Sequence, residues 1–148
     1  DLMYMMKNDS DLFFTCSLIE YIGRECKLRR KDVTDYLGKE YLKRIYKYAG
    51  ILHSEPIAKV ADEYIQICNI PVGDFDNVKS CKYEVPDYWT IGDVYERLIE
   101  DIGGDNTIET LVEVYHSWIS DAISNYNLDF YYQSREYGYE CYQQGHVL

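Results

Sequence analysis

Apolar residues recur at three- and four-residue steps along most of the chain, which is the spacing of one face of an α-helix. The longest such stretch covers residues 106–127. Its apolar face consists of Ile108, Leu111, Val112, Tyr115, Trp118, Ile119, Ala122, Ile123 and Tyr126. We expect this stretch to form one unbroken helix, buried on that face, at the centre of the core.

The same spacing predicts helices over residues 10–26, 39–52, 57–68 and 90–102, and a short helix over 32–37. Gly38 is expected to end the short helix in the left-handed conformation, which glycine adopts without a Cβ clash. Thr90 is expected to cap the helix at 90–102. The tyrosine-rich end of the chain predicts one more short helix, broken near Gly138.

Residues 70–88 show no helical period and contain two of the three prolines. Apolar and charged residues alternate within this stretch, which allows a short extended segment near 78–85. Residues 1–8 are expected to be a loose end. The chain therefore predicts an all-α bundle of six to seven helices in a single domain, 1–148. Helices at 9–69 and 89–148 would form two abutting halves joined by an irregular connection at 70–88.

Cysteine usage and hydropathy indicate the cellular compartment in which the protein is expected. The five cysteines are an odd set without a CxxC pair, which disfavours a disulfide framework and a zinc site. No apolar run approaches the ~20 residues of a membrane span, and the first residues lack the pattern of a signal peptide. We expect a cytoplasmic protein that holds no cofactor and no metal.

The net charge of −11 is unevenly distributed. Residues 24–47 carry nine of the fifteen basic residues, whereas residues 48–148 are strongly acidic. Within the basic stretch, Lys39, Lys43 and Lys47 recur at four-residue steps, with Arg44 beside them. A helix-turn-helix comparison fails, because positions that such a motif needs apolar fall on basic residues. A solvated face, a protein or phosphate contact, and DNA binding remain open for these four residues.

Two histidines are candidate ligand-binding residues. His116 follows Glu113 by one turn and precedes Ser120 by one turn, so an acid, an imidazole and a hydroxyl could share one helix face. His53 follows the helix at 39–52 and could bind a ligand, cap the helix or join an interface. An exposed helix face supplies no oxyanion hole or pocket, so we assign no catalytic residue.

Tyrosine is the compositional peculiarity, with 17 residues. The rings near the end of the chain are too dense for one side of one short helix, so some must face solvent or another chain. Tyrosine is favoured at the energetic centres of protein interfaces. Tyr131, Tyr132, Tyr137 and Tyr142 are therefore candidate partner-binding residues, with packing over the bundle end as the alternative.

The runs IEYIGREC and LKRIYKYAGILHSEPIAKVADEYI resemble a family of small bacterial helical domains. The matching positions are Ile19, Glu20, Tyr48, Leu52 and His53, and Gly50 and Ile51 depart from the pattern. The resemblance covers residues 12–67. It implies a small intracellular helical protein. Some members of the family are suspected partners in toxin–antitoxin loci, and the resemblance implies no catalytic residue.

The sequence thus favours an intracellular protein-interaction or regulatory module, antitoxin-like, that binds a protein partner or itself and no membrane. The alternative is a nucleic-acid-associated regulator that uses the basic face of residues 39–47. An enzyme that uses His116 or His53 is the third hypothesis.

Overall fold

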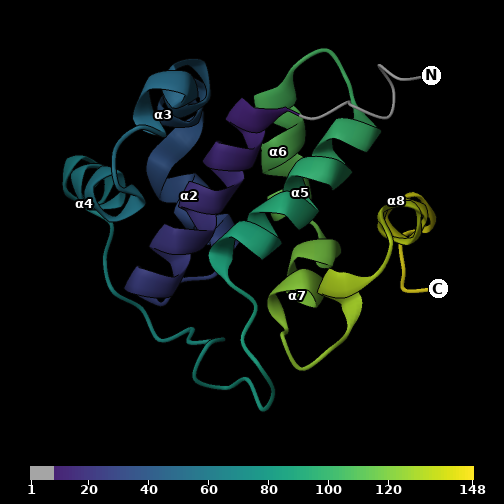
Figure 1. The fold of residues 1–148 in the computed structure, drawn as a ribbon. Coiled ribbons are helices and arrows are strands. Elements are labelled where there is room, and N and C mark those ends of the chain that lie inside the picture. Colours follow the sequence, from purple (N-terminus) through teal and green to yellow (C-terminus); the bar gives the residue numbers. More distant parts are fainter. Residues whose placement is uncertain (1–8) are drawn as a thin grey trace.

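The structure is a computed structural model that describes residues 9–148, so the expected loose end at residues 1–8 lies outside it. Within the described residues the chain forms seven α-helices and one 3-10 helix, without a strand, which confirms the all-α prediction (Figure 1). The elements are α2 (Ser10–Cys26), α3 (Arg30–Leu52), α4 (Ile57–Ile67), α5 (Tyr88–Ile102), α6 (Thr107–Tyr115), α7 (Trp118–Ser124), η1 (Phe130–Tyr132) and α8 (Arg135–Gln144).

Helix α2 is the centre of the core. It packs against α5 and α3, with further contacts to α4 (Figure 1). Leu18 and Ile22 are fully buried, and so are the polar residues Thr15 and Ser17. A helix that is buried on nearly every side must be surrounded by other elements. The prediction that residues 106–127 form the centre is therefore wrong.

The close crossing of α2 and α5 depends on Gly92. A Cβ atom at this position would lie 2.2 Å from Ser17 Oγ and 2.9 Å from the Ser17 Cα and N atoms. Since the missing methyl group leaves room for the backbone of α2, the two helices approach more closely than larger residues would permit. This contact brings the first and second halves of the chain together.

The stretch 106–127 is two helices rather than one, because the helix stops at His116 and restarts after Ser117. Ser117 is extended, with φ −88° and ψ 167°, and its hydroxyl donates to the Val114 carbonyl at 2.7 Å. Serine competes for backbone hydrogen bonds in this way and favours helix starts. The break turns α7, so that Ser120 and Ser124 are buried whereas Trp118 is only partly buried.

Several predicted boundaries need correction. The span of α3 consists of two helices that meet at a kink at Gly38, whose φ of 75° and ψ of 162° are non-helical. The predicted break at this glycine is therefore confirmed, but the first helix begins at Arg30 rather than at residue 32. Asp87, rather than Thr90, caps α5, and its carboxylate accepts from the Thr90 amide at 2.7 Å. Gly138 lies inside α8 without a break.

The connection between α4 and α5 contains turns and irregular backbone, and the extended segment expected near 78–85 does not form. Two backbone hydrogen bonds attach it to the end of α2: Gly73 N donates to Cys26 O at 2.7 Å, and Phe75 N donates to Lys27 O at 2.9 Å. These bonds satisfy carbonyls that a helix end leaves without intrahelical partners. The connection is therefore part of the packed structure.

Ion pairs between Arg135 of α8 and two acidic residues of α5 join these helices. Arg135 donates to both carboxylate oxygens of Asp101 at 2.7 Å and to Glu100 at 2.8 Å. One turn earlier on α5, Glu96 is buried and accepts the backbone N–H of Asp9 at 2.9 Å. Burial, together with the nearby Glu100 carboxyl, raises the pKa of Glu96 to about 7.

This pKa predicts a pH-dependent stability. The folded chain keeps the Glu96 proton up to about pH 7, whereas the unfolded chain releases it near the ordinary value of 4.5. The folded state therefore binds more protons in this window, and stability should fall by up to about 3 kcal/mol as pH rises through it. Glu96→Gln should remove this fall, measured by urea unfolding between about pH 5 and about pH 8. Parallel curves for the two proteins would contradict the assignment.

The α2–α5 crossing gives a second prediction. Gly92→Ala should destabilise the protein by about 1–3 kcal/mol, because the methyl group must displace the backbone of α2. Gly138→Ala is the matched control, since a Cβ atom there meets nothing within 4 Å. That change should stabilise α8 by about 0.5–1 kcal/mol. Urea unfolding of both variants measures the difference, and equal effects would argue against the crossing.

Candidate binding groove

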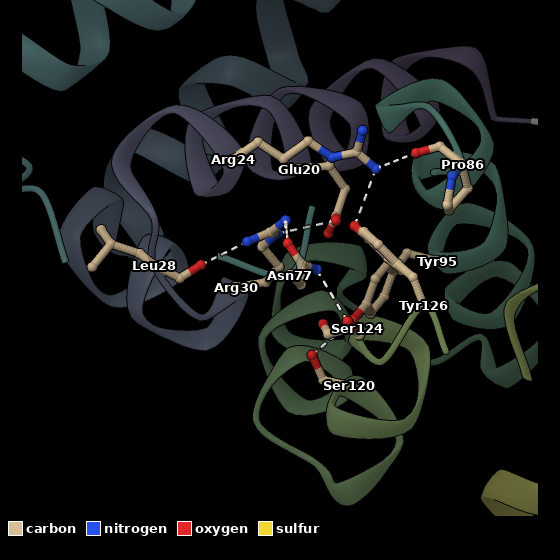
Figure 2. A network of polar contacts seen from close by, with 10 residues as sticks. All are labelled: Glu20, Arg24, Leu28, Arg30, Asn77, Pro86, Tyr95, Ser120, Ser124 and Tyr126. Carbon is tan, nitrogen blue, oxygen red and sulfur yellow. Dashed lines mark hydrogen bonds and ion pairs between the residues drawn. The ribbon is translucent and has the colours of Figure 1, made fainter. Parts of the chain in front are cut away.

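A buried ion pair joins α2 and α3. The side chains of Arg30 and Glu20 are 0% and 1% exposed, and Arg30 Nε donates to Glu20 Oε1 at 3.1 Å (Figure 2). Arg30 Nη1 also donates to the Leu28 carbonyl at 2.7 Å. Gly23 makes room for the guanidinium, because a Cβ atom there would lie 2.4 Å from Arg30 Cδ. Glu20 and Gly23 of α2 thus accommodate the Arg30 side chain, one by its charge and the other by its lack of a side chain.

Burial acts to lower the pKa of Arg30, but Glu20 beside it outweighs this effect and the pKa is raised. Burial raises the pKa of the Glu20 carboxyl, and Arg30 opposes that rise. Each group therefore depends on the other to remain charged in the core.

Asn77 connects the ion pair to the irregular connection and to α7. Its Oδ1 accepts from Arg30 Nη2 at 3.2 Å, and its Nδ2 donates to the Ser124 carbonyl at 3.0 Å (Figure 2). Asn77 itself is buried. One amide therefore fixes the distance between the connection and α7, which are far apart in the sequence.

Three buried tyrosines complete the interior beside the pair. The rings of Tyr95 and Tyr115 stack at 4.0 Å, and the hydroxyls of Tyr95 and Ser120 lie 2.7 Å apart. Burial raises the pKa of both tyrosines well above the ordinary value, so their hydroxyls stay neutral. Arg24 lies over the ring of Tyr126 and donates to its hydroxyl and to the Pro86 carbonyl (Figure 2).

A groove runs along α7 above this network. It consists of three adjoining hollows, of about 90, 370 and 590 Å³. The first and second share Arg29, Phe75, Asp121 and Ser124, and the second and third share Tyr126 and Asn127. We call this surface the α7 groove. Its wall on one side is the irregular connection, which Asn77 holds in place.

The first hollow, the cationic end, lies between the start of α3 and the α6–α7 break. Arg29 is 4.5 Å from the Phe75 ring centroid and 3.5 Å from Asp121. Lys31 and His116 line the same hollow. His116 Nε2 lies 2.8 Å from Asp35 Oδ1 and 3.3 Å from Thr34 Oγ1.

The third hollow, the tyrosine end, is lined by Tyr83, Tyr126, Asn127, Leu128, Asp129, Tyr131 and Tyr132. Tyr83 and Tyr132 are 70% and 67% exposed, and Leu128 is 48% exposed. Tyr131 packs edge-to-face against both Tyr126 and Tyr132. Asn127 fixes the connection here, because its amide donates to Ser80 O and its carbonyl accepts from Lys82 N. Exposed rings on a fixed backbone are suited to contact with another molecule.

The structure separates the four predicted tyrosines. Tyr131 and Tyr132 lie in the groove. Tyr137 packs on Phe130, and its hydroxyl donates to the Leu148 carbonyl at 2.7 Å. Tyr142 is partly buried on α8. The last two therefore serve the packing of the C-terminal helix.

The predicted basic face lies on α3, away from the residues that line the groove. Lys39 donates to Glu109 at 2.7 Å, and Lys47 lies over the ring of Tyr48 at 5.4 Å. Lys43 and Arg44 are exposed. Two of the four cations thus already have partners in this chain.

The acid, imidazole and hydroxyl considered for α6 and α7 are not brought together. His116 contacts α3, Ser120 is buried against Tyr95, and Glu113 is exposed on α6. The break at Ser117 separates Ser120, which lies on α7, from Glu113 and His116, which precede the break.

His53 is exposed at the end of α3 and lines another hollow, with Phe13, Phe14 and Trp89. The polar residues there, Ser10, Asp11 and His53, are exposed. Binding sites usually combine apolar contact with a few well-positioned polar groups. The α7 groove fits this description better, since a buried hydrogen-bond network fixes its wall.

Sequence reasoning missed Arg29, Phe75, Asn77 and Tyr83. Tyr83 could have been found from the general excess of tyrosine. Phe75 and Asn77 lie in a segment without periodicity, where no pattern distinguishes a wall residue from a loop residue.

No family model, curated protein or solved structure matches the chain. Across residues 9–148, no group of His, Cys, Asp and Glu side chains could hold a metal ion. None of the helices in that range is both long enough and apolar enough to cross a membrane.

Loss of Arg30 tests the network. Arg30→Met should cost about 3–5 kcal/mol in unfolding free energy, because Glu20 is left buried without its partner. The loss should be smaller at acid pH, where Glu20 takes up a proton. Urea unfolding at two pH values measures this, and hydrogen exchange should show faster opening of residues 73–83.

The double variant Glu20→Leu, Arg30→Met is the control, because it removes both charges. It should be more stable than Arg30→Met alone. A loss below about 1 kcal/mol in the single variant would mean that the pair does not organise this region.

Proposed function

We propose that this protein is an interaction module with a regulatory role, which binds a segment of a partner protein in the α7 groove. The observation that carries the proposal is the exposure of Tyr83 and Tyr132, about two-thirds or more of each residue, in the hollow at one end of a single groove. Tyrosine supplies a large contact area with few rotatable bonds, so its immobilisation costs little entropy.

The fixed backbone of the groove supports binding without a large rearrangement. Asn77 and Asn127 hold the connection from two points, through Ser124 on one side and Ser80 on the other. A wall that is already ordered loses less conformational entropy when a partner binds.

The free cysteines support an intracellular, reducing location, which we propose is the cytoplasm. An antitoxin-like role is part of the proposal only through the resemblance of residues 12–67. The alternative is a nucleic-acid-associated regulator using residues 39–47, which salt-sensitive DNA retardation, lost on changing Lys39, Lys43, Arg44 and Lys47, would support.

The test places a photo-crosslinking amino acid, p-benzoylphenylalanine, at Tyr132 or, as a control, at Tyr48, which is 43% exposed on α3. Crosslinking in the native host should join one protein at position 132 and not at position 48. That protein, identified by mass spectrometry and purified, should bind the unmodified chain.

The variant Tyr83→Ser, Leu128→Ser should weaken this binding at least about tenfold, since it removes two exposed contacts from the interface centre. A product of twice the 17.5 kDa chain mass would identify self-association as the interaction. Crosslinking at position 48 alone, or binding that is unchanged in the variant, would reject the groove.

A further inference from the structure

Two arginine side chains lie over aromatic rings that line the α7 groove. The Arg24 guanidinium is 5.2 Å from the Tyr126 centroid and donates to the Tyr126 hydroxyl at 3.1 Å. The Arg29 guanidinium is 4.5 Å from the Phe75 centroid. Each contact combines a planar cation with the negative face of a ring. Two rings that line the groove, Tyr126 and Phe75, are therefore each in contact with an arginine of this chain.

The tyrosine end has the rings but no cation of its own among its lining residues. Tyr83 and Tyr132 are the most exposed of them. Two exposed acidic residues belong to this end of the groove: Asp129 lines the hollow, and Glu84 directly follows Tyr83 in the chain. The basic residue nearest in the chain is Lys82, which precedes Tyr83. Its side chain is exposed, and its backbone N–H donates to Asn127 Oδ1.

We propose that the tyrosine end of the α7 groove binds an arginine-bearing segment of the partner, with a guanidinium stacked on Tyr83 or Tyr132 and hydrogen-bonded to Glu84 or Asp129. The inference rests on the proposed function, because it names the chemistry of the partner that the groove binds. The charge of the second part of the chain agrees with it, since residues 48–148 are strongly acidic.

Arginine fits this surface better than lysine or an apolar side chain. Its guanidinium is planar, is weakly hydrated and directs five N–H groups in its plane, so one group can stack on a ring and bind a carboxylate. Lysine provides a compact and strongly hydrated charge instead. An apolar occupant would bury the carboxylates of Glu84 and Asp129 without partners, which is unfavourable.

Isothermal titration with a hexa-arginine peptide at physiological salt tests the proposal. Hexa-lysine should bind more weakly, and hexa-citrulline, which keeps the shape of arginine without its charge, should bind least. The variant Tyr83→Leu, Tyr132→Leu keeps apolar area but loses the ring faces. It should weaken hexa-arginine binding by about five- to twentyfold, as expected for two exposed cation–π contacts.

The matched control is Tyr36→Leu, Tyr48→Leu, which removes two exposed rings of α3 and should leave hexa-arginine binding unchanged. All four positions are exposed, so thermal unfolding should confirm that both variants fold. The double variant Glu84→Gln, Asp129→Asn should also weaken hexa-arginine binding. Adding Tyr83→Leu and Tyr132→Leu to that variant should weaken the binding little further.

The proposal is overturned if the control weakens binding as much as the groove variant, or if hexa-citrulline binds as tightly as hexa-arginine. In either case, crosslinking at position 132 could still identify a partner of different chemistry. The proposed function would then stand without this inference, whereas failure of the crosslinking itself would reject the groove as the partner site.

Discussion

The structure depends on one buried ion pair, between Glu20 and Arg30. Removing two charges from water is costly, and the attraction between them only offsets this cost when the remaining hydrogen-bonding groups are satisfied. Arg30 meets this condition on three sides, through Glu20, the Leu28 carbonyl and Asn77, whereas the buried Oε2 atom of Glu20 has no hydrogen-bond partner among the described residues. The pair is therefore best understood as a device for specificity: it selects one arrangement of α2, α3 and the connection, because any other leaves a buried charge alone.

This specificity extends to the surface. Residues 70–87 have no helix and bury few apolar side chains, so hydrophobic packing alone would not fix their path. Asn77 provides the missing constraint, since its amide joins Arg30 to the Ser124 carbonyl. Hydrogen bonds to buried residues of the core thus help to position the wall of the α7 groove. Through these hydrogen bonds, a change at Glu20 in α2 would alter the path of the connection at the surface.

The periodicity of the sequence was sufficient to predict the fold class and most helices, because each helix must bury a stripe of apolar residues. The periodicity did not identify α2 as the centre of the core, and the reason is physical. In α2 the residues Thr15, Ser17 and Glu20 resemble a solvent face, but small polar groups can be buried where helices cross closely, and a carboxylate can be buried beside an arginine. Conversely, residues 106–127 keep their apolar period through Ser117, so the helix break has no counterpart in the hydrophobic pattern. The groove was predicted only in part: Tyr131 and Tyr132 were found from composition, whereas Asn77 and Phe75 depend on contacts between distant segments.

The excess of tyrosine has two distinct physical explanations. Tyr95, Tyr115 and Tyr126 are buried, and the hydroxyls of Tyr95 and Tyr126 are matched by Ser120 and Arg24, respectively. Tyr83 and Tyr132 present their rings to solvent at the end of the same groove. A residue with an apolar ring and a polar tip can serve both environments, which is why composition could not separate them. Tyr126 contacts Arg24 in the interior network and Tyr131 at the tyrosine end, and Tyr131 packs on Tyr132, so a chain of contacts joins the network to the exposed ring of Tyr132.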